Sequence, residues 1–432
     1  RSSTTCLGRT VSEMTPAKGY AKMKDSGIEW VGMIPATWDV FPAGGVFDEV
    51  KEKNVNNQYS NPFSFRYGEI VDKKIVGEID ESVEETLSAY RVVSPNTIMI
   101  NGLNLNYDFI SQRVAIVREK GIITSAYLAV QPDEGRIVPR FVLYLLKAYD
   151  YRQVFHGVGS GIRKTLKFQD FKSIKIVAPS LTEQTAIASY LDTQCAKIDE
   201  IIAQAKASIE DYKQWKVSII YEAVTKGLNP NVEMKDSGIE WIGKMPSRWE
   251  ISRVKNVVTN LDYLREPISA ENRENKLGLY DYYGASGVID KIDDYNVDDT
   301  VLLIGEDGAN LRMRNLPLVY RASGKFWVNN HAHILKVKPG YSYGFIAYLL
   351  EAGDYNVYIT GSAQPKLSQF NLMRFPIVVP DFEEQLQIEK YLDKWCMQID
   401  ALIEEKEAFL EEMESYKKSL VYEVVTGKRR VI

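Results

Sequence analysis

A short motif occurs twice in this chain of 432 residues, and the repeat limits what the chain can fold into. Residues 23–38 read MKDSGIEWVGMIPATW and residues 234–249 read MKDSGIEWIGKMPSRW, at an offset of 211 residues. A second pair, EQTAIASYLDTQCAKID from residue 183 and EQLQIEKYLDKWCMQID from residue 384, repeats at an offset of 201. Because both motifs recur in the same order, the sequence predicts two related halves, each with a motif, a globular region and a long helix.

The second motif of each half begins a long run of apolar residues spaced three or four apart, which is typical of a coiled coil. Ser180 with Glu183, and Asp381 with Glu384, form the capping pattern expected just before a helix. A helix of this length cannot bury its apolar stripe within one small domain, so we expect the two helices to pack against each other. The positions expected in the buried stripe include Ile187, Leu191, Ile198, Ile201, Trp215, Ile388, Leu392, Leu402 and Phe409.

The two globular regions mix short strand-like runs with turns and one amphipathic helix each. We therefore predict the α+β class, with two homologous α/β domains separated by two long helices. The helices are expected to form an antiparallel coiled coil with pseudo-two-fold symmetry. The expected bounds are a disordered leader at 1–22, a first domain at 23–180 with its motif at 23–40, a helix at 181–228, a second domain at 229–380 with its motif at 234–251, and a second helix at 381–432.

The net charge of −5 comes from the long helices. Residues 183–227 hold five Lys against seven Asp and Glu, and residues 384–430 hold eight Lys and Arg against eleven Asp and Glu. The globular regions are therefore close to neutral and free to carry local basic surfaces. No run of 18 apolar residues occurs, so we expect no contact with a membrane. The three cysteines form no CxxC pair and no secretion signal is visible, which favours a cytoplasmic protein with reduced thiols.

The motifs of common catalytic sites are missing from the sequence. The glycine-rich loop at 157–165 lacks the second glycine of a phosphate-binding loop, and no GxGxxG or HExxH occurs. We therefore expect neither catalysis nor a bound metal or cofactor in this chain.

Polar loops that follow strands are the best candidates for a binding surface, because amide, guanidinium and ammonium groups on such loops read the edges of DNA bases. In each half, one such loop follows a strand and a second loop is rich in glycine. The candidates in the first half are Asn101, Asn104, Asn106, Tyr107, Arg163, Lys164 and Lys167. The candidates in the second half are Asn310, Arg312, Arg314, Gln364 and Lys366. Two domains that share a fold but differ in their loop residues could recognise two different DNA sequences.

Taken together, the doubled MKDSGIEW motifs, the doubled YLD helix starts and the YEAVT and YEVVT helix ends resemble the specificity (S) subunit of type I restriction-modification enzymes. The resemblance covers nearly all of residues 23–430. It implies that each globular domain is a target recognition domain that reads half of a bipartite site through the major groove of double-stranded DNA. It further implies that the helix pair sets the spacer and docks two methyltransferase (M) subunits, which restriction and translocase (R) subunits join.

The same resemblance places the chemistry on the partner subunits. S-adenosylmethionine, ATP and Mg would be bound there, and adenine-N6 methylation and ATP-dependent cleavage would occur there. Three other interpretations stay open at this point: a coiled-coil scaffold that joins two protein-binding domains, a recognition subunit whose partner fuses methylase and nuclease, and an enzyme with an unrecognised site.

Overall fold

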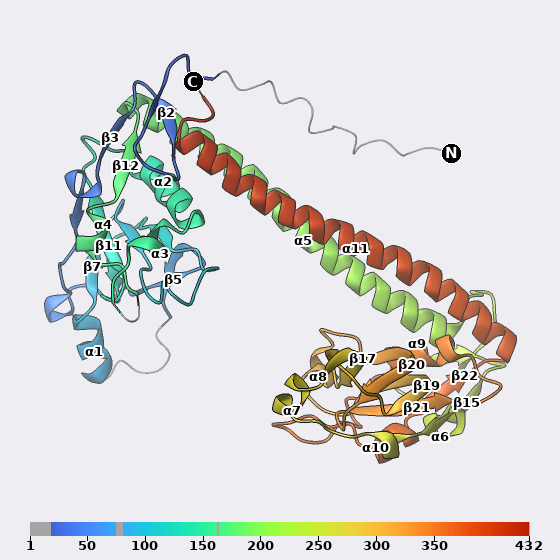
Figure 1. Cartoon of the computed structure of the whole chain (residues 1–432). Coiled ribbons are helices and arrows are strands. Elements are labelled where there is room, and N and C mark those ends of the chain that lie inside the picture. The colour runs from blue at the N-terminus through green and yellow to red at the C-terminus, as the bar shows by residue number, and fades with distance from the viewer. Residues whose placement is uncertain (1–18, 75–80, 162–163, 432) are drawn as a thin grey trace. The chain divides into compact units, whose positions relative to one another are not determined.

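The computed structural model describes residues 19–74, 81–161 and 164–431, so most of the expected leader at 1–22 lies outside the described residues. The chain divides into two compact units. Unit 1 comprises residues 1–205 and 409–432, and unit 2 comprises residues 206–408. Two unbroken helices, α5 (Leu181–Lys226) and α11 (Phe382–Val425), each begin in one unit and end in the other (Figure 1).

Unit 1 is built around an antiparallel sheet that is buried on both faces. Its strand order is β4 (Phe47–Glu49), β11 (Leu128–Pro132), β8 (Ile98–Ile100) and β9 (Val114–Ile116). Ile98 and Ile100 pack with helix α2 (Pro139–Tyr151), whereas Met99 between them packs with Phe63 on the other face. This alternation follows from the two-residue period of a strand and explains why the strands are almost wholly apolar.

The other elements of unit 1 surround this sheet. They are β1 (Met23–Asp25), β2 (Met33–Pro35), β3 (Asp39–Pro42), β5 (Phe63–Arg66), β6 (Glu69–Asp72), α1 (Glu81–Ser88), β7 (Arg91–Val93), β10 (Gly121–Ile123), α3 (Val154–Val158), α4 (Phe168–Phe171) and β12 (Lys175–Ala178). Strand β12 pairs with β3, so the end of the globular region returns to its beginning before α5 starts.

Unit 2 repeats this plan with a larger sheet. Its strand order is β16 (Val258–Asn260), β21 (Ala332–Val337), β19 (Val297–Gly305), β20 (Val319–Val328), β17 (Leu277–Gly284) and β18 (Gly287–Ile292). Helix α9 (Tyr343–Ala352) corresponds to α2 and packs on the same face. The remaining elements are β13 (Met234–Asp236), β14 (Lys244–Pro246), β15 (Glu250–Arg253), α6 (Val254–Val257), α7 (Ala270–Glu274), α8 (Asn310–Met313), α10 (Gln369–Arg374) and β22 (Pro376–Val379).

The repeated tryptophan motif anchors the C-terminal end of a long helix in each unit. In unit 1, the carbonyl oxygen of Trp30 accepts a hydrogen bond of 3.0 Å from the Tyr422 hydroxyl of α11. In unit 2, the carbonyl oxygen of Trp241 accepts one of 3.0 Å from the Tyr221 hydroxyl of α5. Trp38 of the first motif is fully buried. The motif is therefore a packing element, as its two tryptophans suggested.

Within each unit, the two long helices run antiparallel and are joined by the same ion pair. Lys417 Nζ lies 2.7 Å from Asp199 Oδ2 in unit 1, and Lys216 Nζ lies 2.7 Å from Asp400 Oδ2 in unit 2. The two aspartates are equivalent positions of the repeat at the offset of 201, and so are the two lysines. Each ion pair thus joins one residue from each half of the sequence.

The predicted α+β class, the two related α/β domains and the antiparallel helices are confirmed, but the predicted buried stripe is partly wrong. Ile201, Trp215, Leu402 and Phe409 are 38–42% exposed. The reason is geometric, since a pair of helices has only a narrow seam to cover apolar side chains away from the domain cores. None of the helices within the described ranges combines the length and apolar composition needed to cross a bilayer.

Candidate nucleic-acid interface

The two candidate loops of unit 1 lie side by side. The Leu105 amide donates to the carbonyl oxygen of Lys164 at 3.0 Å, and the Leu166 amide donates to that of Gly102 at 2.9 Å. The loop that follows β8 is therefore joined by its backbone to the glycine-rich loop. The sequence placed candidate residues on both loops, and the fold brings the two loops together into one surface.

A buried arginine fixes the shape of this surface from below. The Arg113 side chain is 1% exposed, and its Nη1 donates to the carbonyl oxygens of Asn101 and Leu103 at 2.9 Å each. Its Nη2 donates to the carbonyl oxygen of Asp108. The backbone amide of Arg113 donates to Asp150 Oδ2 at 2.7 Å, while burial raises the pKa of Asp150 to about 6 against the opposing effect of that hydrogen bond. Hydrogen bonds from a charged group to several carbonyl oxygens hold a loop in one conformation.

The candidates of unit 1 differ in what their side chains contact. Asn104 and Tyr107 are exposed, and the Tyr107 side chain is 72% accessible. Asn101 is half-buried and accepts a hydrogen bond of 3.2 Å from the Leu103 amide. The half-buried residue Asn106 and the exposed residues Lys164 and Lys167 complete the described set. The remaining candidate, Arg163, lies outside the described residues.

The two candidate loops of unit 2 are joined in the same way as those of unit 1. The Leu367 amide donates to the carbonyl oxygen of Glu306 at 2.7 Å, and the Gly308 amide donates to that of Pro365 at 3.0 Å. An ion pair reinforces the contact, since Lys366 Nζ lies 2.9 Å from Glu306 Oε1. The equivalent loops of the two units are thus paired, although their sequences differ.

A buried histidine and its neighbours support the loops of unit 2. The His333 side chain is fully buried, with Nδ1 at 2.6 Å from Asp262 Oδ2 and Nε2 at 2.8 Å from the carbonyl oxygen of Leu367. Burial works against ionisation of Glu306, but hydrogen bonds from Lys366 and Arg265 outweigh it and hold the pKa of that carboxyl below its usual value. The histidine therefore has a structural role beneath the second surface.

Three candidates of unit 2 have side chains engaged within their own domain. The Asn310 amide closes its loop, with Nδ2 donating to the carbonyl oxygen of Leu316 at 3.0 Å and Oδ1 accepting from the Leu316 amide at 2.9 Å. Arg314 has a φ of +54° and donates to the carbonyl oxygen of Glu351. Lys366 is held by its ion pair. Arg312 and Gln364 are exposed, and Arg312 Nη2 donates one long hydrogen bond of 3.5 Å to the carbonyl oxygen of Gly361.

The sequence reasoning missed the large apolar side chains that are exposed near the first surface. Tyr67 is 91% exposed and Ile110 is 95% exposed. Neither residue was predicted, because both are apolar or aromatic side chains outside the polar residues expected to read base edges. The available signal was the Tyr-Gly pair between two strand-like runs, which departs from the Asn-Gly and Asp-Gly pairs usual in a hairpin turn.

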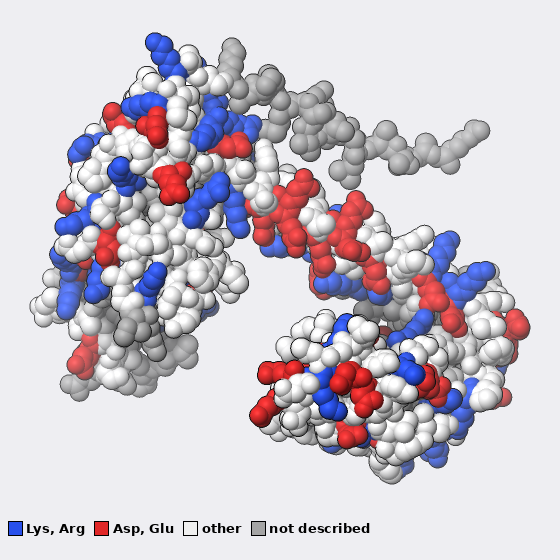
Figure 2. Space-filling model, viewed as in Figure 1, with Lys and Arg blue, Asp and Glu red and all other residues white. Residues whose placement is uncertain are grey.

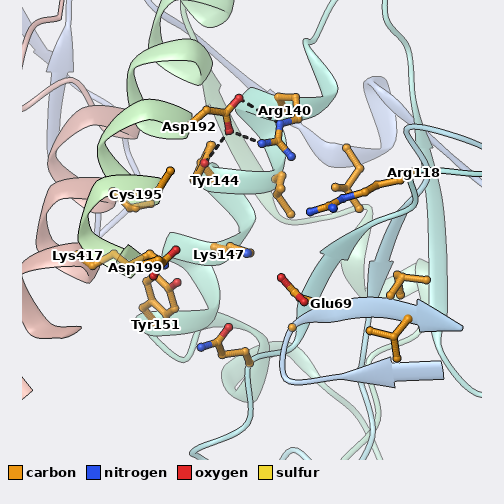
Figure 3. A pocket seen from close by; sticks show the side chains of 18 residues that line it. Glu69, Arg118, Arg140, Tyr144, Lys147, Tyr151, Asp192, Cys195, Asp199 and Lys417 are labelled. Carbon is orange, nitrogen blue, oxygen red and sulfur yellow. Dashed lines mark hydrogen bonds and ion pairs between the residues drawn. The ribbon is translucent and has the colours of Figure 1, made fainter. Parts of the chain in front are cut away.

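A second feature recurs at the junction of each domain with the long helices. In unit 1, Asp192 of α5 accepts a hydrogen bond of 2.7 Å from the Tyr144 hydroxyl and pairs with Arg140 (Figure 3). In unit 2, Asp393 of α11 accepts one of 2.8 Å from the equivalent Tyr348. Asp393 also pairs with an arginine, Arg321, which belongs to strand β20, whereas Arg140 of unit 1 belongs to helix α2. The repeated charge cluster fixes the domain on its helix in both units.

The cluster of unit 1 opens into a cavity of about 450 Å³. Lys147 and Arg118 point into it, and so does Glu69 from strand β6 (Figure 3). Burial lowers the pKa of Lys147 below its usual value, and the nearby charge of Lys417 lowers it further. No group of His, Cys, Asp and Glu side chains suited to a metal ion occurs in the described part of the chain.

The surface charge is divided as the sequence suggested. Figure 2 shows Asp and Glu side chains gathered along the long helices, with Lys and Arg scattered over unit 1. The two helical cysteines are buried in separate clusters, since Cys195 packs in the core of unit 1 and Cys396 in that of unit 2.

Comparison with known proteins points to one family. Residues 35–211 and 246–412 each match the family model of the type I restriction modification DNA specificity domain. The putative specificity subunit of the type I restriction enzyme MjaX from Methanocaldococcus jannaschii is 24% identical over 424 residues, which cover 93% of this chain and 96% of that protein. A putative type I restriction enzyme specificity subunit from Haemophilus influenzae is 29% identical over 160 residues, 37% of this chain and 38% of that protein.

The fold is also shared with a solved structure. One chain of a structure described as "Structural basis underlying complex assembly and conformational transition of the type I R-M system" has a TM-score of 0.70 at 14% identity. The match covers 91% of this chain and 98% of that chain.

Proposed function

This chain belongs to the family of type I restriction-modification DNA specificity subunits, with two recognition domains, and from this we propose that each domain reads one half of a bipartite DNA site through the major groove. The observation that supports the proposal best is the pairing of two loops at the same place in both domains. In each unit, a loop after a central strand is hydrogen-bonded to the glycine-rich loop, and exposed polar side chains project from both. A rigid frame with different loop residues suits two different half-sites.

The candidates whose side chains are exposed on the two surfaces are the ones that would contact DNA. Asn104, Tyr107 and Lys164 are the first choice in unit 1, and Arg312 and Gln364 are the first choice in unit 2. The amide and guanidinium groups of such residues pair with base edges, whereas lysine reaches phosphate oxygens. Asn106, Lys167, Asn310, Arg314 and Lys366 then serve to shape the loops or to contact the DNA backbone.

We further propose that the helix pair sets the spacer and docks two methyltransferase subunits, to which the restriction and translocase subunits bind. Apolar side chains left exposed on the helices of unit 2 support a docking role, because isolated helices rarely present them to water. Val217 and Met397 are each 68% exposed and Trp215 is 42% exposed. S-adenosylmethionine, ATP and Mg would be held by those partners, which would methylate adenine and cleave DNA. The assembly would work in the cytoplasm, where its DNA is.

The test is a map of methylated adenines in cells that express this chain with its methyltransferase subunit. Replacing Gln364 and Arg312 by Ala should relax or abolish recognition of one half-site and leave the other unchanged, since each bidentate base contact contributes about 1–3 kcal/mol of discrimination. The same result for the other half-site is expected from Asn104→Ala. Lys235→Ala, an exposed lysine of the β13–β14 hairpin, is the matched control.

Two outcomes would contradict the proposal. If variants of one domain altered both half-sites together, the assignment of one half-site to each domain would be wrong. If no sequence preference depended on either domain, a scaffold that joins protein partners would be the better interpretation. A single partner chain carrying both methylase and nuclease activities in the purified complex would instead identify the related fused system.

A further inference from the structure

The turn between β5 and β6 holds a large aromatic residue in a backbone conformation that such residues avoid. Arg66 pairs with Glu69, so the loop consists of only Tyr67 and Gly68. Their φ values are +49° and +74°, both positive, as a type I′ hairpin turn requires. Asn, Asp and Gly are the usual residues at the first position, because other side chains clash with the backbone there. A tyrosine at this position does not help the hairpin to fold.

The ring of this tyrosine is also unprotected from water. Tyr67 is 91% exposed, and Ile110 from the neighbouring loop is 95% exposed. Both line an open cavity of about 520 Å³, together with Asn101, Gln112 and Arg66. Two large exposed apolar side chains beside a surface cavity that also holds amide groups are typical of a binding site.

The hairpin is packed firmly against the candidate DNA surface of unit 1. A Cβ atom added at Gly68 would lie 2.7 Å from Gln112 Oε1 and 2.8 Å from its Cβ, so the turn and this loop are in direct contact. Asn101 belongs to both the cavity and the candidate surface. The exposed tyrosine therefore projects from a supported position, and its ring is presented beside the loop that follows β8.

The chemistry of the cavity matches that of a nucleic-acid base. Amide groups such as those of Asn101 and Gln112 offer a donor and an acceptor each, which suits the edge of a base. An aromatic ring stacks on any base, and apolar side chains also enter between base steps of duplex DNA. Gln112 also lines the cavity of Figure 3, where Arg118 provides a positive charge for a phosphate group.

We propose that the β5–β6 hairpin is a second DNA-reading element of the first recognition domain. Tyr67 and Ile110 contact the face of a base or the methyl group of a thymine, and Asn101 and Gln112 hydrogen-bond to the base edge. Arg118 contacts a neighbouring phosphate. The proposal rests on the proposed function, because it assigns further specificity residues to the same DNA-bound surface.

The substitution Tyr67→Asn separates a role in DNA binding from a role in folding. Asn is well suited to the left-handed conformation of this turn, so the variant is expected to melt at the same temperature as the parent chain or higher. Loss of a stacked aromatic contact is expected to weaken binding by about 5- to 150-fold. Ile110→Ser is the second variant, and Val55→Ser, at an apolar residue of unit 1 that is 60% exposed, is the matched control.

The measurement is the affinity of the purified complex with its methyltransferase subunit for a duplex that carries the mapped site. Photocrosslinking of Tyr67 to 5-iodouracil placed at successive positions of the first half-site locates the contact. Unchanged affinity of the Tyr67→Asn complex, together with no crosslink from Tyr67 in a parent complex that binds the site sequence-specifically, would overturn this proposal and leave the proposed function intact. Loss of the methyltransferase subunit from the variant complex would show instead a protein-docking surface. A parent complex without sequence preference would refute the proposed function itself.

Discussion

Lengthening both long helices by the same amount is expected to widen the spacer between the two half-sites by a calculable number of base pairs. The two ion pairs between the helices show where residues can be added. Asp199 pairs with Lys417 in unit 1 and Lys216 pairs with Asp400 in unit 2, with 16 residues between the pairs on each helix. Segments inserted within these 16-residue stretches leave both pairs, and the packing around them, unchanged.

The register of the antiparallel helices selects the insertion points. Following the ion pairs, the position after Ala205 in α5 lies opposite the position after Leu410 in α11. An insertion of about 25 residues adds about 37 Å of helix, at 1.5 Å per residue, and completes about seven turns. The same length corresponds to about 11 base pairs, which is close to one turn of DNA. Both the protein and the DNA therefore keep their rotational phase, and the two reading surfaces meet equivalent faces of the duplex.

Methylated-adenine mapping reads the result directly. The double insertion, with apolar residues kept at the three-to-four spacing, should methylate the same two half-site sequences with a spacer about 11 base pairs longer. Insertion of the same segment in only one helix is the control, because it breaks the register of the ion pairs and should lower the melting temperature. An unchanged spacer in a folded, active double variant would refute the idea that the helices measure the gap.

Four further substitutions, one of them a control, test the energetics of unit 1. Asp150→Asn should remove a pH dependence: the folded-state pKa of about 6 exceeds the unfolded value of 3.8, so this carboxyl stabilises the fold below pH 4 and loses about 3 kcal/mol of that stabilisation as the pH rises through 6. Parallel curves of unfolding free energy against pH for parent and variant would contradict this. Gly427→Ala should cost about 2–4 kcal/mol, because φ is +70° and the added Cβ would lie 2.2 Å from Pro35 Cδ, whereas Gly32→Ala, at φ +65° in open space, should cost only about 1 kcal/mol. Equal melting temperatures of these two variants would show that the contact at the helix end is loose. Tyr422→Phe should cost about 1 kcal/mol by removing the hydroxyl that anchors α11 to the first motif, and a denaturant midpoint equal to that of the parent would exclude this anchor.

The long helices and the doubled domains could be predicted because their signals are local and repeated. A three-to-four spacing of apolar residues over more than thirty positions has no good alternative to a helix, and a helix of this length needs a second one. The strands at the centre of each sheet were also visible as short apolar runs. The spacing could not show how wide the buried stripe is, since the width depends on how much of each helix the other long helix covers. For this reason Ile201 and Leu402 were expected inside and are exposed.

The polar loops of the candidate surfaces could be predicted from the sequence, but the buried side chains that hold these loops in place could not. Polar loops after strands could be found in the sequence, and the fold pairs them. The groups that hold these loops in shape come from distant parts of the chain, such as Arg113 in unit 1 and His333 in unit 2. Neither stands in a motif, because a buried side chain under a loop is defined by the hydrogen-bond partners that the fold places around it. The exposed Tyr67 was missed for a different reason, since its signal was only a Tyr-Gly pair where a hairpin turn usually has Asn-Gly or Asp-Gly.

The way the ion pairs combine the two halves of the sequence explains why the duplication has been kept in the helices but not in the loops. Each half contains both members of the pair, an aspartate and a lysine 17 residues later, as in Asp199 with Lys216. In an antiparallel arrangement, the aspartate of one half meets the lysine of the other, so a sequence change in one half loses a contact unless the other half changes with it. The loops are under no such constraint, because each is supported within its own unit. The helices are therefore coupled across the two halves of the sequence by these contacts, while the two surfaces are free to differ in the sequences that they recognise.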